Sequence, residues 1–82
     1  MKFGKIFDCT RTEEAKQYIG KRGVFSNFLR DIIKWPEEKC FGTLVDVVYN
    51  DAYPFMWQDE DGRRAPFQFF RPILEQEKGD RI

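Results

Sequence analysis

Basic and aromatic side chains alternate between Arg63 and Arg71, and further aromatic residues lie between Tyr53 and Trp57. Rings that stack on bases beside arginines that contact phosphates are typical of proteins that bind single-stranded nucleic acid. The same residue types dominate the energetic centres of protein–protein interfaces, and in a small domain they also suit a hydrophobic core. The sequence alone does not choose among these three interpretations. The candidate binding residues in this part of the chain are Tyr53, Trp57, Arg63, Arg64, Phe67, Phe69 and Arg71.

Trp35 is the other candidate binding residue. It precedes Pro36 at the end of the segment 27–36, whose apolar residues fit either a short helical turn beginning at Ser26 or a long loop. Proline disfavours helical geometry in the residue before it, so the segment is expected to end there. A large ring at this place either anchors a partner from an exposed loop or plugs one end of the folded sheet.

The sequence gives little evidence for a catalytic or metal-binding site. The chain has no histidine, which is the commonest general base and metal ligand. Two cysteines, Cys9 and Cys40, are too few for a zinc site, and they are expected to be free, buried thiols. Ser26, the single serine, lies in no nucleophile motif. We therefore expect no enzyme activity, no cofactor and no metal.

Acidic residues cluster in three places, none of which predicts a site. Glu13-Glu14 and Glu37-Glu38 are neighbours in sequence and do not define an acid–base pair across a cleft. The run 59–62 has the Asp-x-Asp-Gly pattern of a calcium loop. Its spacing, however, puts Trp57 and Gln68 where such a loop needs carboxylates. The run is better explained as a hairpin turn, because Asp-Gly supplies the positive φ of tight turns.

The elements that would position these residues follow from local patterns. Residues 10–20 are predicted to be a helix, with Thr10 and Glu13 as a capping box. The β-branched run 42–49 is the expected central strand, and shorter strands are expected at 21–26, 54–58 and 65–70. The predicted organisation is an N-terminal arm or edge strand over 1–9, a helix over 10–20, a small β-barrel over 21–74 and a flexible tail over 75–82.

This layout resembles SH3-like small barrels, in which a first strand and a long loop precede three hairpin-linked strands. The resemblance covers Gly20 to Leu74 and rests on four segments: Gly20-Lys21-Arg22-Gly23-Val24-Phe25, Gly42-Thr43-Leu44-Val45, Tyr53-Pro54-Phe55 and Phe70-Arg71-Pro72-Ile73. It also looks like small uncharacterised domains of phages and mobile elements. The resemblance implies a mainly β (α+β) fold, a partly open barrel of about five strands with one N-terminal helix. The acidic first loop and the groove of SH3 peptide binders are missing, so it implies no binding residues.

Charge and hydropathy limit the possible partners. The 14 basic and 14 acidic residues cancel, which argues against a dedicated nucleic-acid binder. Residues 1–34 hold eight basic and four acidic side chains, whereas residues 35–62 hold one basic and seven acidic. The folded chain is therefore expected either to have faces of opposite charge or to have an ordinary mixed surface. No apolar run approaches the length of a membrane span and no signal peptide precedes the chain, so we expect a cytoplasmic protein.

The leading expectation is a small, non-enzymatic domain that binds a protein partner, as a monomer or a homodimer, without a membrane. The resemblance to phage domains implies that it modulates a host factor. One alternative is a barrel that binds single-stranded nucleic acid through Arg22, Arg63, Arg64 and Arg71. Another is a domain whose aromatic pocket sequesters a small nucleotide-like ligand.

Overall fold

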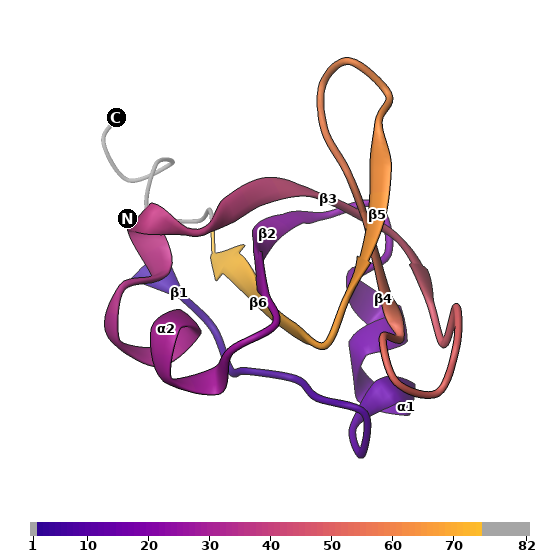
Figure 1. Cartoon of the computed structure of the whole chain (residues 1–82), viewed down its shortest axis with the longest axis horizontal. Helices are drawn as coiled ribbons and strands as arrows, with labels where there is room; N and C mark the ends of the chain where they lie inside the picture. Colours follow the sequence, from indigo (N-terminus) through magenta and orange to yellow (C-terminus); the bar gives the residue numbers. More distant parts are fainter. Residues whose placement is uncertain (1, 75–82) are drawn as a thin grey trace.

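A computed structural model describes residues 2–74 of the 82-residue chain, so the tail expected at 75–82 lies outside the described residues. The chain forms strands and short helices in the order shown in Figure 1. They are β1 (Lys2–Phe3), α1 (Thr12–Ala15), a 3-10 helix (Lys16–Tyr18), β2 (Arg22–Ser26), α2 (Leu29–Lys34), a 3-10 helix (Pro36–Glu38), β3 (Cys40–Val47), β4 (Phe55–Gln58), β5 (Arg64–Phe67) and β6 (Phe69–Leu74).

The fold is mainly β, as predicted, and it is built on one open sheet with six strands where about five were expected. Its six strands lie in the order β1-β6-β2-β3-β4-β5, and every neighbouring pair is antiparallel. The sheet therefore has two edges, β1 and β5, and it curls strongly between them (Figure 1). The N-terminal arm supplies the additional edge strand, because Lys2 and Phe3 pair with Leu74 and Ile73 of β6.

The core is an aromatic cluster centred on Phe70. This fully buried ring lies 4.9 Å from the ring of Phe25, 6.0 Å from Phe55 and 6.4 Å from Phe7, measured between centroids. Large rings bury much apolar area per residue, which lets a short chain form a core without disulfides. Ala15, Leu44 and Val47 complete the cluster, and Tyr18, Trp57 and Phe67 pack against it.

Two strands depart from the simple alternation expected of them. In β3 the pairing with β4 shifts between Leu44 and Asp46, which is the signature of a β-bulge at Val45. Because of the extra residue, Leu44 and Val47 are both buried although three positions separate them. The run 65–70, expected as one strand, instead breaks at Gln68 into β5 and β6, which lie on opposite sides of the sheet order.

The N-terminal helix is shorter than the predicted span 10–20, and Thr10 does not cap it. The hydroxyl and backbone N–H of Thr10 both donate to the Asp8 carboxylate, at 2.6 and 2.9 Å. These two hydrogen bonds lower the pKa of Asp8, against the opposing effect of burial. The residue before the helix is Arg11, whose side chain makes no capping bond. A local Asp8–Thr10 turn has therefore displaced the capping box.

The segment 27–36 contains the short helix α2 (Leu29–Lys34), so the helical alternative is the correct one, but the helix does not begin at Ser26. Phe28 is its N-cap residue and no side chain caps it. The Ser26 hydroxyl instead accepts a hydrogen bond from the N–H of Phe28 at 3.0 Å and turns the chain between β2 and α2. The helix lies against β2 and β6 (Figure 1) and buries Ile32 completely. It ends at Trp35, before the buried Pro36. None of the helices within residues 2–74 is long and apolar enough to cross a membrane.

Candidate functional site

The most conspicuous surface of the molecule lies on the segment that contains α2. Four of its large apolar side chains are exposed to solvent: Phe28 is 67% exposed, Leu29 45%, Ile33 50% and Trp35 46%. A helix of six residues can bury one side only, and Ile32 occupies that side. The apolar residues in excess of one stripe therefore remain in water. We refer to Phe28, Leu29, Ile33 and Trp35 as the α2 surface.

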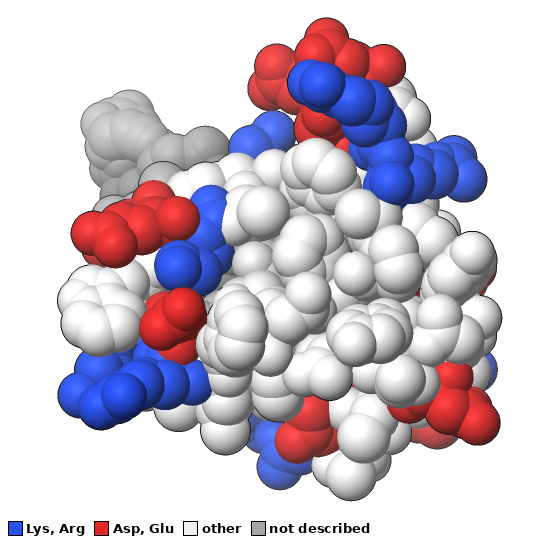
Figure 2. All heavy atoms as spheres, viewed as in Figure 1, with Lys and Arg blue, Asp and Glu red and all other residues white. Residues whose placement is uncertain are grey.

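An open groove adjoins the α2 surface. It has a volume of about 400 Å³, and its lining includes Phe25, Phe28 and Phe67. At one side the ammonium group of Lys39 meets the carboxylate of Asp31 at 3.4 Å. Figure 2 shows that the uncharged surface continues from here across β2 and the β5–β6 corner, with charged groups around its margin. A partner would find an apolar platform with a charged rim, which is the usual anatomy of a protein interface.

Trp35 belongs to this surface and does not plug the sheet. Its backbone N–H donates to the carbonyl of Asp31 at 2.8 Å, which closes the last turn of α2. With its φ and ψ at −133° and 55°, the residue leaves helical geometry. Almost half of the surface of the residue faces solvent. Of the two roles that the sequence allowed for Trp35, the geometry matches the exposed one.

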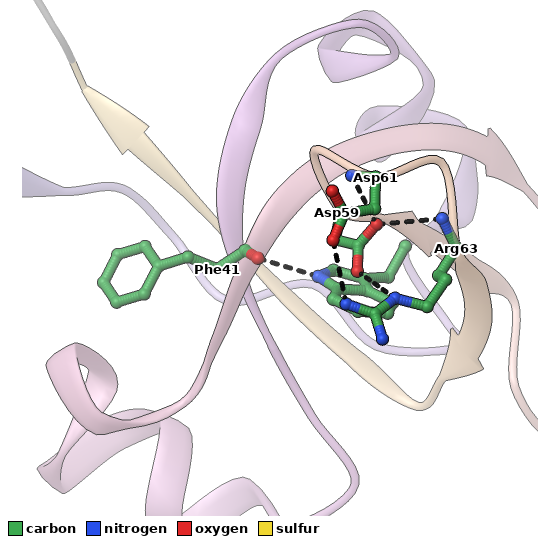
Figure 3. Close-up of polar contacts among 5 residues, drawn as sticks. Phe41, Asp59, Asp61 and Arg63 are labelled. Carbon is green, nitrogen blue, oxygen red and sulfur yellow. Dashed lines mark hydrogen bonds and ion pairs between the residues drawn. The ribbon is translucent and has the colours of Figure 1, made fainter.

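The arginines that were expected to contact a partner are engaged within the chain. In the β4–β5 turn, Arg63 forms ion pairs with Asp59 at 2.9 Å and with Asp61 at 3.0 Å (Figure 3). Arg64 donates from Nε to Oε1 of Gln58 at 2.6 Å. The guanidinium of Arg22 lies 3.8 Å from the carboxylate of Glu60. Three of the four candidate phosphate ligands therefore contact acidic or amide oxygens of their own chain.

Arg71 makes contacts within the chain that connect three segments. Its guanidinium donates to the carbonyl of Gly4 at 2.9 Å and to the carbonyl of Ile32 at 3.2 Å. The same group lies 5.4 Å from the centre of the Phe3 ring, within range of a cation–π contact. Arg71 thus ties the N-terminal segment and α2 to β6. It lies apart from Arg63 and Arg64, which belong to the opposite end of the sheet order.

The rings expected beside these arginines mostly serve the core. Trp57 and Phe67 meet edge to face, 6.0 Å between centroids, and both pack against the core cluster. The indole N–H of Trp57 donates to the carbonyl of Phe41 at 2.8 Å (Figure 3). Phe69 is half-buried at the β5–β6 corner, and only Tyr53 is exposed. The structure does not gather the candidate residues of 53–71 into one basic and aromatic surface.

The turn that contains Arg63 is built as its Asp-Gly sequence predicts. Gly62 has φ of 89°, and its N–H donates to the carbonyl of Asp59. Burial raises the pKa of Asp59, but hydrogen bonds from the backbone and guanidinium of Arg63, together with its positive charge, outweigh that effect. The pKa therefore lies below its ordinary value of 3.8. The Asp59 carboxylate stabilises the turn rather than forming a reactive site.

A second exposed apolar group lies on the loop between β3 and β4. Val48, Tyr49 and Tyr53 all face solvent there. Val48 has φ of 65°, a left-handed conformation that is strained for a β-branched residue. Asn50 holds the loop by accepting hydrogen bonds from the backbone of Ala52 and Tyr53. Tyr53 therefore belongs to this loop, on a different part of the chain from the α2 surface.

Neither cysteine matches the expectation of a buried thiol. Cys9 and Cys40 are free, as predicted, but both are exposed. Cys9 lies beside the β5–β6 corner and Cys40 lines the groove next to α2. Within the part of the chain that the structure describes, no three His, Cys, Asp or Glu side chains are grouped so as to hold a metal ion.

Comparison with protein-family models, with curated proteins and with solved structures finds no match to this chain. A function therefore has to be inferred from the chain's own residues. Sequence reasoning selected Trp35 but missed Phe28, Leu29 and Ile33. The signal that could have found them is the number of apolar residues: Phe28, Leu29, Ile32 and Ile33 exceed what one side of a two-turn helix can bury.

Proposed function

We propose that the chain is a non-enzymatic domain that acts by binding another protein through the α2 surface. The exposure of four large apolar side chains within residues 28–35 carries this proposal. The chain buries its other phenylalanines wholly or in part. Leaving this group in water is therefore unfavourable unless a partner covers it. Trp35 is of a residue type that is enriched among hot spots, and Phe28 is of a type that is enriched at protein interfaces.

The engagement of the arginines favours a protein partner over a nucleic acid. A phosphate backbone would have to compete with Asp59 and Asp61 for Arg63, and with two backbone carbonyls for Arg71. Binding of nucleic acid depends on cations that release counterions from the phosphates. Arg63 and Arg22 already face carboxylates of their own chain, so they contribute less to that term than unpaired arginines would. A small-ligand pocket is also disfavoured, since the groove beside α2 is open to solvent rather than enclosing.

The layout of the sheet supports a finer proposal about its family. Strand β2, the long segment 27–39 and the three successive antiparallel neighbours β3, β4 and β5 follow the order expected of a partly open, SH3-like barrel. We propose that the chain is a variant of that fold with an added edge strand. The resemblance to phage and mobile-element domains extends the proposal to a protein that modulates a host factor.

The experiment compares three tagged proteins in a nuclease-treated pull-down that is analysed by mass spectrometry. Wild type should retain a stoichiometric protein partner, and the double variant Phe28→Ser/Ile33→Ser should lose it. Tyr49→Ser is the matched control, because Tyr49 is equally exposed but lies on the β3–β4 loop. All three should unfold at similar urea concentrations, since exposed side chains contribute little to stability. A partner that all three proteins retain, or none for the wild type, would exclude the α2 surface as the binding site.

A further inference from the structure

The solvent side of α2 carries two stripes of different chemistry. Leu29 and Ile33 are one helical turn apart. Arg30 follows Leu29, and Lys34 follows Ile33. Successive residues of an α-helix are rotated by about 100°. The apolar pair and the basic pair therefore run side by side along the exposed half of the helix, while Ile32 faces inward. Figure 2 shows basic side chains gathered over α2, next to uncharged ones.

The two cations of this stripe are available to a partner. Arg30 and Lys34 are both exposed, and within residues 2–74 neither forms an ion pair, whereas Lys39 pairs with Asp31 at 3.4 Å. A partner that placed carboxylates beside its apolar residues would match both stripes at once. Such complementarity raises the association rate and disfavours partners with the wrong charge.

We propose that the partner segment recognised by α2 is acidic and amphipathic, with apolar side chains next to carboxylates, as on one face of a helix. This inference rests on the proposed function and specifies its partner. The apolar side chains of the segment cover Leu29 and Ile33, both of which are exposed. Its carboxylates lie along Arg30 and Lys34. The mode is that of an amphipathic helix that packs its apolar face against an exposed apolar stripe.

Two other occupants fit the charges less well. An anionic membrane would be attracted by Arg30 and Lys34, but Glu37 and Glu38, which follow Pro36, are exposed and would be repelled by the same headgroups. A second copy that packed its own α2 antiparallel through Leu29 and Ile33 would place the basic stripes of both copies on the same side. The four like charges would then repel each other. An acidic partner segment encounters neither conflict.

The test is a selection from a displayed library of random peptides of about 16 residues, a little over four helical turns. Peptides are selected on the wild-type protein, and those that still bind Phe28→Ser/Ile33→Ser are discarded. The remaining peptides should contain more Asp and Glu than Lys and Arg. Their affinity should fall about tenfold in Arg30→Glu/Lys34→Glu, as expected for two exposed charge pairs. The control Lys21→Glu reverses another exposed cation outside α2 and should leave affinity unchanged.

The outcomes separate this inference from the proposed function. Two results would overturn the inference alone. In the first, the peptides depend on Phe28 and Ile33 but carry no excess of acidic residues. In the second, they bind the Arg30→Glu/Lys34→Glu variant as well as they bind wild type. A library without any peptide that depends on Phe28 and Ile33 would overturn both. A dimer in sedimentation that dissociates in Ile33→Ser would identify a second copy as the occupant. Binding to phosphatidylserine vesicles that Arg30→Glu/Lys34→Glu abolishes would identify a membrane. Either of these last two results would also overturn the inference.

Discussion

Gly23 and Gly42 lie directly opposite each other across β2 and β3, and an aromatic ring covers each of them. A Cβ at Gly23 would overlap the ring of Phe70 and come within 2.6 Å of the Arg71 carbonyl oxygen. A Cβ at Gly42 would overlap the indole of Trp57 and come within 2.7 Å of the Gln58 carbonyl oxygen. The absence of side chains at the two glycines therefore leaves room for two rings. Phe70 fills the space at Gly23 in the centre of the core, and Trp57 lies over Gly42, where it donates to the carbonyl of Phe41.

Alanine at either glycine should destabilise the fold. Gly23→Ala is expected to have the larger effect, about 3 kcal/mol, because Phe70 is fully buried and cannot move aside. Gly42→Ala should lower the free energy of unfolding by about 2 kcal/mol, since the half-buried indole of Trp57 can shift while losing its hydrogen bond. Urea unfolding followed by tryptophan fluorescence measures both. Thr43→Ala, the next residue in β3, is the control and should change stability by less than about 1 kcal/mol. Equal stability of all three variants would contradict the role given to the glycine pair.

Acid should destabilise the protein in part through Asp59. The pKa of this carboxyl is lower in the folded chain than its ordinary value of 3.8. Its contribution to stability is therefore complete above that value and is lost as the pH falls through the folded pKa. Asp59→Asn should show a shallower fall in the free energy of unfolding between about pH 5 and pH 2.

The measurement is a series of urea titrations of wild type and variant across that range. Asp8→Asn provides a second case, because hydrogen bonds from Thr10 lower the pKa of Asp8 in the same direction. Parallel curves for wild type and Asp59→Asn would show that the carboxylate is not specifically stabilised in the turn.

Replacing Arg71 should loosen the N-terminal segment. Arg71→Lys keeps the charge but cannot reach the carbonyls of Gly4 and Ile32 with one planar group, so stability should fall by roughly 1–3 kcal/mol. Hydrogen exchange at Gly4, whose N–H donates to the Pro72 carbonyl, should become faster. Arg64→Lys is the matched control at an exposed position and should stay within about 0.5 kcal/mol of wild type. An unchanged Arg71→Lys would remove the structural role assigned to this guanidinium.

Relieving the strain at Val48 should stabilise the protein. Val48→Asn replaces a β-branched residue at φ of 65° by one that tolerates the left-handed region, so the free energy of unfolding should rise by about 0.5–1 kcal/mol. Thermal unfolding measures the gain. The same change at Thr43, within a regular stretch of β3, should destabilise, because asparagine is disfavoured in strands. If Val48→Asn lowers the free energy of unfolding as well, the side chain of Val48 stabilises the fold by more than the backbone strain costs.

Chemistry local to each segment could be read from the sequence. The β-branched and aromatic runs indicated the positions of β2, β3 and β4, and Asp-Gly predicted the turn at 59–62, because these preferences act between near neighbours. The same reasoning failed where two local options competed. Thr10 donates both of its hydrogen bonds to the Asp8 carboxylate and does not cap the helix, which begins later than the capping box predicted.

Contacts between distant segments were decided only by the tertiary structure. The bulge at Val45 depends on the register of β4. The hydrogen bonds of Arg71 go to the carbonyls of Gly4 and Ile32, which are far from it in sequence. The α2 surface arose in the same way. The sequence supplied more apolar residues than a two-turn helix can bury. The packing of Ile32 towards β2 and β6 determined which of them, Phe28, Leu29 and Ile33, were left for a partner.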